Sequence, residues 1–115
     1  MNILRKKLSK DTLYTEYSKI LNGVLQLSKR EVEVFSFLLK ADAEGNKDNI
    51  NTRQIRTDII NTYKISEANL SRYLGVLKDK GLILKGNNGK LILNDLVRPI
   101  VMDTVLELKF LLEIV

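Results

Sequence analysis

Residues 64–83 read KISEANLSRYLGVLKDKGLI, and this stretch decides the fold that the rest of the chain has to accommodate. Ser66 suits a helix N-cap because its hydroxyl oxygen can accept a hydrogen bond from a backbone amide of the first turn. Leu70, Leu74 and Leu77 recur at helical spacing and form one apolar face. Gly81 can adopt the left-handed conformation that commonly ends a helix. The stretch therefore predicts an amphipathic helix that starts at Ser66 and stops before Gly81.

Another helix is expected to begin after Ser28. Ser28 and Glu31 have the spacing of a capping box, in which the two side chains satisfy free backbone amides at the helix start. Leu27 and Val32 can pack together across this cap as a hydrophobic staple. We expect the helix to end near Ala41, before the polar, Gly- and Asn-rich loop of residues 42–49.

A third helix is expected between these two. Asn51 is its predicted N-cap, with Gln54 as the capping-box partner three residues later. Ile50 and Ile55 are placed to form the staple around it.

The residues before Ser28 give a mixed pattern. Residues 12–27 predict a helix in their first half, a stop or turn at Asn22-Gly23 and a short extended piece after it. Residues 1–11 are short, basic and polar, which is typical of a terminal arm.

Residues 82–93 predict a β-hairpin. Two apolar runs flank Gly86-Asn87-Asn88-Gly89, and Asn and Gly tolerate the positive φ angles of tight hairpin turns. Pairing about Asn87 and Asn88 would put Lys85 opposite Lys90, and like charges at cross-strand positions are unfavourable. Two interpretations of this lysine pair are open: an anionic partner binds both side chains, or they only keep the hairpin soluble.

Residues 99–115 are expected to form a C-terminal strand or dimerisation segment. From Thr104 onward apolar and polar residues alternate with the period of a strand, and β-branched residues near the end favour the same structure. Pro99 interrupts any helix that would continue from the hairpin. The alternative is a helix that buries Val101, Val105, Leu108 and Leu112.

The composition argues against an enzyme. The 115 residues include no Cys and no His, which removes thiolate nucleophiles, the commonest zinc ligands and the usual general base near neutral pH. The acidic residues form no recognisable pair or metal cluster, and the glycines follow neither a phosphate-loop nor a dinucleotide-binding spacing. We expect no enzymatic activity, no metal and no cofactor.

The net charge of +5 is unevenly distributed along the chain. Residues 1–30 and residues 51–93 each sum to +5, whereas residues 31–50 sum to −3 and residues 94–115 to −2. Two basic segments suit a polyanionic partner, although basic residues also simply solvate exposed faces. The first ten residues lack the apolar run of a signal peptide and no segment approaches the length of a membrane span, so we expect a cytoplasmic protein that does not enter a membrane.

Helix, loop, helix, tight turn, helix and hairpin is the element order of a winged helix-turn-helix. Over residues 28–93 the chain resembles winged-helix transcription regulators of the antibiotic-resistance-regulator type, above all at Thr52-Arg53-Gln54-Ile55, at the Ser66 helix and at Gly81-Leu82-Ile83. The short length and the Asn-, Lys- and Ile-rich composition also resemble small winged-helix proteins of tailed phages. The flanks differ, because those regulators usually carry long dimerising helices.

The resemblance implies an α+β fold. It consists of a three-helix winged helix-turn-helix core with a C-terminal β-hairpin as the wing, within a domain of residues 12–98, and an extra strand follows at the C-terminal end.

The resemblance also implies that the Ser66 helix enters the major groove of duplex DNA. The residues expected to read base edges lie opposite its leucines and are Ala68, Asn69, Ser71 and Arg72. The residues expected to hold phosphates lie on the preceding helix, the turn and the wing and are Arg53, Arg56, Lys64, Lys85 and Lys90.

The leading expectation is therefore a sequence-specific protein that binds duplex DNA and regulates transcription. The alternative is a winged-helix module that binds protein in a replication, transcription or virion assembly, which Glu67 on the reading face and the apolar tail favour. A homodimer, or a protein partner bound through residues 99–115, is expected in either case, because tail strands can pair edge to edge.

Overall fold

The computed structural model describes residues 12–102 and 105–107, and within them the chain forms an α+β fold. The helices are α1 Leu13–Leu25, α2 Lys29–Ala43, α3 Arg53–Tyr63 and α4 Glu67–Asp79. One antiparallel hairpin joins β1 Ile83–Lys85 to β2 Leu91–Leu93, and a second joins β3 Ile100–Met102 to β4 Val105–Glu107. Short 3-10 turns lie at η2 Asn87–Gly89 and η3 Asp95–Val97. The expected basic arm at residues 1–11 lies outside the described residues.

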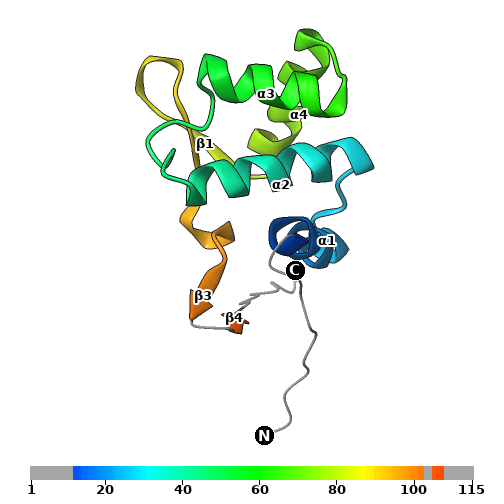
Figure 1. The fold of residues 1–115 in the computed structure, drawn as a ribbon, viewed down its shortest axis with the longest axis vertical. Helices are drawn as coiled ribbons and strands as arrows, with labels where there is room; N and C mark the ends of the chain where they lie inside the picture. Colours follow the sequence, from blue (N-terminus) through cyan, green and yellow to red (C-terminus); the bar gives the residue numbers. More distant parts are fainter. Residues whose placement is uncertain (1–11, 103–104, 108–115) are drawn as a thin grey trace, which may run out of the picture.

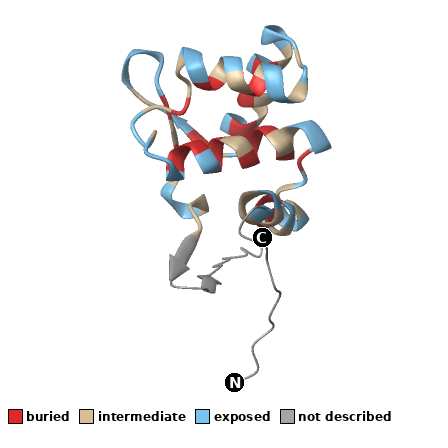
Figure 2. Cartoon of the chain, viewed as in Figure 1, coloured by how far each residue is buried: buried red, intermediate tan, exposed pale blue. Residues whose placement is uncertain are grey.

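Helix α2 runs through the middle of the fold, with α1 on one side and α3 and α4 on the other (Figure 1). It also contacts β2. Phe35 and Leu38 of α2 are fully buried, and buried residues of the other helices and of the β1-β2 hairpin face them in the interior (Figure 2). The core therefore joins all four described helices to this hairpin.

The helix starts predicted at Ser28 and Ser66 are confirmed. The Ser28 hydroxyl accepts from the Glu31 amide, and the Glu31 carboxylate accepts from the Ser28 amide at 2.9 Å, which completes the capping box. The Ser66 hydroxyl accepts from the Asn69 amide at 3.0 Å. Helix α2 continues to Ala43, slightly beyond the expected end near Ala41.

The predicted start of α3 is wrong by one residue. Thr52, not Asn51, is the N-cap, and its hydroxyl accepts from the Ile55 amide at 3.2 Å. Gln54 does not return to a backbone amide as a capping-box partner, because it donates to the Asp58 carboxylate at 2.8 Å. The Asn51 side chain is used elsewhere, as an acceptor for Arg56.

The stop predicted at Asn22-Gly23 is also wrong, because α1 continues through both residues to Leu25. Gly23 is exposed with open space around it, so nothing there forces the helix to break. Asn22 acts one turn later: its side chain accepts from the Leu27 amide and donates to the Leu27 carbonyl at 3.2 Å. Gln26, with φ +55°, provides the left-handed residue that ends the helix.

The predicted hairpin forms, but its register differs by one residue. Lys85 lies opposite Leu91, not Lys90, and the Gly86 amide donates to the Lys90 carbonyl at 2.8 Å. The loop accordingly has three residues, with positive φ at Asn88 and Gly89. The two lysines are not a cross-strand pair, so the argument from like-charge repulsion does not apply.

The segment after β2 is fixed to the helices. The buried hydroxyl of Tyr17 in α1 donates to the Val97 carbonyl at 2.7 Å. The buried carboxylate of Asp42 in α2 accepts from the Arg98 guanidinium at 3.0–3.3 Å, and Lys47 lies 3.4 Å from the same carboxylate. These contacts join residues 97–98, which lead into β3, to α1 and α2.

The C-terminal strand expected in residues 104–115 is present at Val105–Glu107. A further strand at Ile100–Met102 was not expected, and it pairs antiparallel with the first. Residues 103–104 and 108–115 lie outside the described part of the chain, so the alternation expected there stays a prediction.

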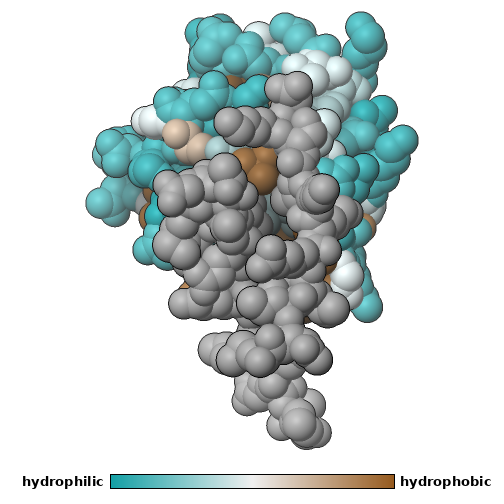
Figure 3. All heavy atoms as spheres, turned by 60° about the horizontal axis from the view of Figure 1, so that its bottom comes forward, coloured by the Kyte–Doolittle hydropathy of each residue, from teal (hydrophilic) through white to brown (hydrophobic). Residues whose placement is uncertain are grey.

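Within the described residues no helix has both the length and the hydropathy that crossing a bilayer requires. On the face drawn in Figure 3, most of the described surface is hydrophilic, with small hydrophobic areas between.

Candidate nucleic-acid interface

Helix α4 presents a polar front opposite its buried leucines. Leu70, Leu74 and Leu77 are 0%, 7% and 0% exposed, so this face belongs to the core. Ala68 and Arg72 lie on the opposite side and are exposed. No described segment covers this front, which leaves it accessible for a partner.

The other two expected base-reading residues lie on the flanks of α4. Ser71 is exposed on the flank next to α3, where it contacts Arg56. Asn69 is partly buried on the other flank, and its backbone amide donates to the Ser66 hydroxyl. The structure therefore groups Ala68, Ser71 and Arg72 on the open surface and sets Asn69 further back.

Arg72 is restrained by its neighbour. Its guanidinium carbon lies 5.4 Å from the centre of the Tyr73 ring, within the range of a cation–π contact. Tyr73 is partly buried against the core, so its ring provides a fixed support. This contact limits the conformations open to the Arg72 side chain.

Arg56 connects α3 to α4. It was expected to bind a phosphate, but its donors are used within the protein. Its Nε and Nη2 atoms both donate to Oε1 of Glu67, with an Nε to Oε1 distance of 2.7 Å. Nη2 also donates to the Ser71 hydroxyl at 2.9 Å, and Nη1 donates to Oδ1 of Asn51 at 2.8 Å. Four of the five guanidinium N–H groups are thus occupied, which leaves little capacity for a phosphate.

This arginine network reaches the hairpin through Asn49. Oδ1 of Asn49 accepts from the backbone amides of Asn51 at 2.9 Å and Leu91 at 3.2 Å. The Ile50 amide donates to the Leu91 carbonyl at 2.8 Å. A continuous set of hydrogen bonds therefore links β2, the start of α3 and the open flank of α4.

The other expected phosphate contacts are exposed cations on three elements. Arg53 lies at the start of α3, Lys64 in the turn before α4, and Lys85 and Lys90 at the hairpin tip. Lys64 has φ +54°, so the α3-α4 turn depends on a left-handed residue other than glycine. Lys85 pairs with Leu91 and therefore lies on the same face of the hairpin as Leu91. Lys90 is the neighbour of Leu91 in the chain, and because successive residues of a strand point to opposite faces, it lies on the other face.

Sequence reasoning missed the pairing of Arg56 with Glu67. The two residues are eleven positions apart, on helices joined by a tight turn, so neither the helical i,i+4 rule nor a capping pattern brings them together. The only sequence signal is a single acidic residue at the start of an otherwise basic face, which was interpreted as support for a protein partner.

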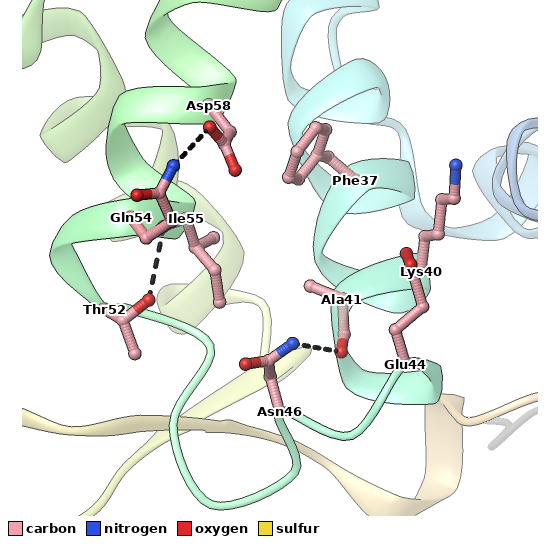
Figure 4. Close-up of a pocket in the computed structure, with 9 residues that line it drawn as sticks. All are labelled: Phe37, Lys40, Ala41, Glu44, Asn46, Thr52, Gln54, Ile55 and Asp58. Atoms are coloured by element: carbon pink, nitrogen blue, oxygen red, sulfur yellow. Dashed lines mark hydrogen bonds between the residues drawn. The ribbon is translucent and has the colours of Figure 1, made fainter.

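Two hollows lie near the helices but away from this surface. One, of about 250 Å³, lies between α2 and α3, with Phe37 and Lys40 on one side and Gln54 and Asp58 on the other (Figure 4). Most of its polar side chains bond within the protein, such as Asn46 to the Ala41 carbonyl at 3.0 Å. The second, of about 450 Å³, is bordered by α1, α2 and Tyr63, whose pKa is raised by burial and by Glu33.

Neither hollow includes a residue of the α4 front or of the hairpin tip. In the described residues no group of three or more Asp or Glu side chains is placed to hold a metal ion. The candidate surface carries exposed cations, amides and hydroxyls, together with the Glu67 carboxylate that Arg56 orients.

Comparison with family models, curated proteins and solved structures finds no match to this chain. The interpretation of the surface therefore rests on its own residues and geometry.

Proposed function

We propose that this chain is a winged-helix protein that binds duplex DNA sequence-specifically and regulates transcription. The observation that carries the proposal is the polar front of α4, which stays exposed while Leu70, Leu74 and Leu77 anchor the helix in the core. A helix presented in this way can enter the major groove with its N-terminal residues against base edges. The β1-β2 hairpin would act as the wing.

The side chains on α4 have chemistries that suit base reading. Arg72 can bond guanine or a phosphate, Ser71 can bond either base type, and Ala68 can contact a thymine methyl. Asn69 can bond adenine in two places once its flank meets the groove wall.

Phosphate binding is assigned to the four exposed cations Arg53, Lys64, Lys85 and Lys90. Arg56 was expected in this group, but its bonds to Glu67, Ser71 and Asn51 favour a different role. With four phosphate contacts, the logarithm of the affinity should fall with the logarithm of the salt concentration with a slope of about −4.

The test is a salt titration of binding to random and genomic duplexes, with light scattering to give the mass of the complex. Lys85→Gln and Lys90→Gln should each make the slope less steep by about 1. Lys40→Gln is the matched control, because Lys40 is exposed on α2 beside the hollow of Figure 4 and should leave the slope unchanged. Binding that is absent, or that does not depend on salt, would contradict the proposal.

A protein-binding winged-helix module is the second candidate, because two large apolar side chains lie on the surface near the wing. Leu84 of β1 is 43% exposed and Leu96 of η3 is 86% exposed. Exposed apolar side chains of this size are more typical of protein contacts than of phosphate contacts. Replacing Arg72, Lys85 and Lys90 by Glu should abolish DNA binding and leave a protein contact at these leucines intact.

A further inference from the structure

Glu67 is an acidic residue on the candidate surface, and it is held there by an arginine of the neighbouring helix. The Glu67 side chain is 62% exposed at the first position of α4, whereas the Arg56 side chain that holds it is only 19% exposed. Arg56 comes from α3 and is itself bonded to Asn51 and Ser71. Glu67 is therefore an exposed anion with a fixed, largely covered counter-ion.

The contacts of Arg56 leave one oxygen of Glu67 available. Both guanidinium donors bind Oε1, and Oε2 has no hydrogen-bond partner among the described residues. An ionised carboxylate only accepts hydrogen bonds. The free oxygen can therefore recognise a donor, and it repels groups that are themselves acceptors.

We propose that Glu67 is a specificity-determining residue that accepts a hydrogen bond from the N4 amino group of a cytosine in the major groove. This inference rests on the proposed function and names the base chemistry read by the same surface. Guanine presents two acceptors in that groove, thymine presents an acceptor and a methyl group, and adenine has an acceptor beside its amino group. Cytosine alone presents a donor with no acceptor next to it, so it suits an oriented carboxylate best.

Arg56 acts here as a positioning residue. Because its donors are occupied by Asn51, Glu67 and Ser71, it fixes the direction of the carboxylate without touching the DNA. It also partly neutralises Glu67, which limits the repulsion between this carboxylate and the phosphates on either side of the groove. Loss of Arg56 should therefore blur the base preference that Glu67 provides.

The experiment is selection from a randomised duplex library with the full chain, four single variants and one double variant. The wild type should enrich cytosine at one base-pair position, and Glu67→Gln should lower that preference roughly tenfold or more while the other positions keep theirs. Glu67→Gln should also bind random duplexes more tightly, since a repulsive charge is removed. Asp79→Asn is the matched control, because Asp79 is an exposed acid at the far end of α4 and its loss should change no position.

Arg56→Met should lower the same cytosine preference, but it should add nothing in a Glu67→Gln background, because it acts only through Glu67. Arg56→Lys keeps the charge and should restore part of the preference, which a merely structural role would not predict. If Arg56→Met fails to fold by circular dichroism, the lysine variant provides the comparison.

Three outcomes would overturn the inference. They are an unchanged preference at every position in Glu67→Gln, a change at the same position in Asp79→Asn as in Glu67→Gln, and a full effect of Arg56→Met in the Glu67→Gln background. If the wild type still enriches a DNA sequence in any of these cases, the inference fails but the proposed function stands. If the wild type enriches no sequence and binds no duplex, both the proposed function and the inference fail.

Discussion

The Tyr17 hydroxyl is a buried polar group with one well-placed partner. The residue is 3% exposed, it donates to the Val97 carbonyl at 2.7 Å, and burial raises its pKa from 10.0 to about 12. The folded state thus favours neutral tyrosine. Because the folded pKa lies above the unfolded one, the stability that this preference contributes is fully present below pH 10 and is lost as the pH rises through 12.

We expect Tyr17→Phe to change the pH dependence of stability as well as its value. Below pH 10 the variant should be about 1 kcal/mol less stable, because the Val97 carbonyl loses its donor. Between pH 10 and 12 the wild type should lose up to roughly 2–3 kcal/mol more than the variant, as ionisation of Tyr17 takes effect. Urea denaturation at several pH values measures both differences, and parallel curves up to pH 12 would contradict the expectation.

Arg56 is a residue whose position the sequence indicates but whose binding partner it does not. The sequence indicates that position 56 lies on the polar side of a helix, and the structure agrees that the residue stays out of the apolar core. It does not indicate whether a cation there meets solvent, a phosphate or a neighbouring carboxylate. That choice depends on the crossing of α3 and α4, which is set by packing of side chains far apart in the chain.

The helix starts at Ser28 and Ser66 were predicted correctly, whereas the start of α3 and the end of α1 were not, although their capping contacts are also local. The starts at Ser28 and Ser66 depend on atoms within a few residues, so their patterns were sufficient. The predicted hairpin register, with Lys85 opposite Lys90, was wrong, because the Asn- and Gly-rich loop also permits a turn that is longer by one residue. The structure selects the one in which Leu91 bonds Asn49 and Ile50, and residues more than 40 positions away carry no local signal.

The end of α4 offers a matched test of backbone conformation. Gly81 has φ +78°, and the amides of Gly81 and Leu82 bond back to the carbonyls of Lys78 and Leu77, which is the Schellman arrangement. Gly75 lies within the same helix at ordinary helical φ, and a Cβ at either glycine meets nothing within 4 Å. Alanine at these two positions therefore meets no steric clash, and its effect depends on the backbone conformation of each site.

We expect Gly81→Ala to lower the free energy of unfolding by about 1–2 kcal/mol, because alanine is strained in the left-handed region. Gly75→Ala should raise it by roughly 0.5–1 kcal/mol, because alanine favours the helix and loses less entropy on folding. Thermal or urea denaturation of the two variants supplies the comparison. Equal effects of the same sign would show that the strain is relieved elsewhere in the turn.

At the scale of the whole molecule, α1 is held by residues from the other end of the chain. Lys80, just after α4, donates to the carbonyls of Leu25 at 2.7 Å and Gln26 at 3.2 Å. These carbonyls lie at the end of α1, where backbone acceptors have no partner within the helix and the dipole favours a cation. With the bond from Tyr17 to Val97, α1 is joined to both the α4 end and the segment after β2.

This arrangement predicts different roles for two lysines that are two positions apart. Lys78 is also exposed at the end of α4, but its side-chain ammonium makes no hydrogen bond to the described residues, so Lys78→Met should change stability by less than about 0.5 kcal/mol. Lys80→Met removes the same charge and should cost about 1 kcal/mol or somewhat more, because two helix-end carbonyls lose a charged donor. Hydrogen exchange should locate the loss at the end of α1, with faster exchange of the Gln26 amide that bonds the Asn22 carbonyl. If both variants lose equal stability, the effect is one of net charge, and α1 is held by its apolar contacts with α2 alone.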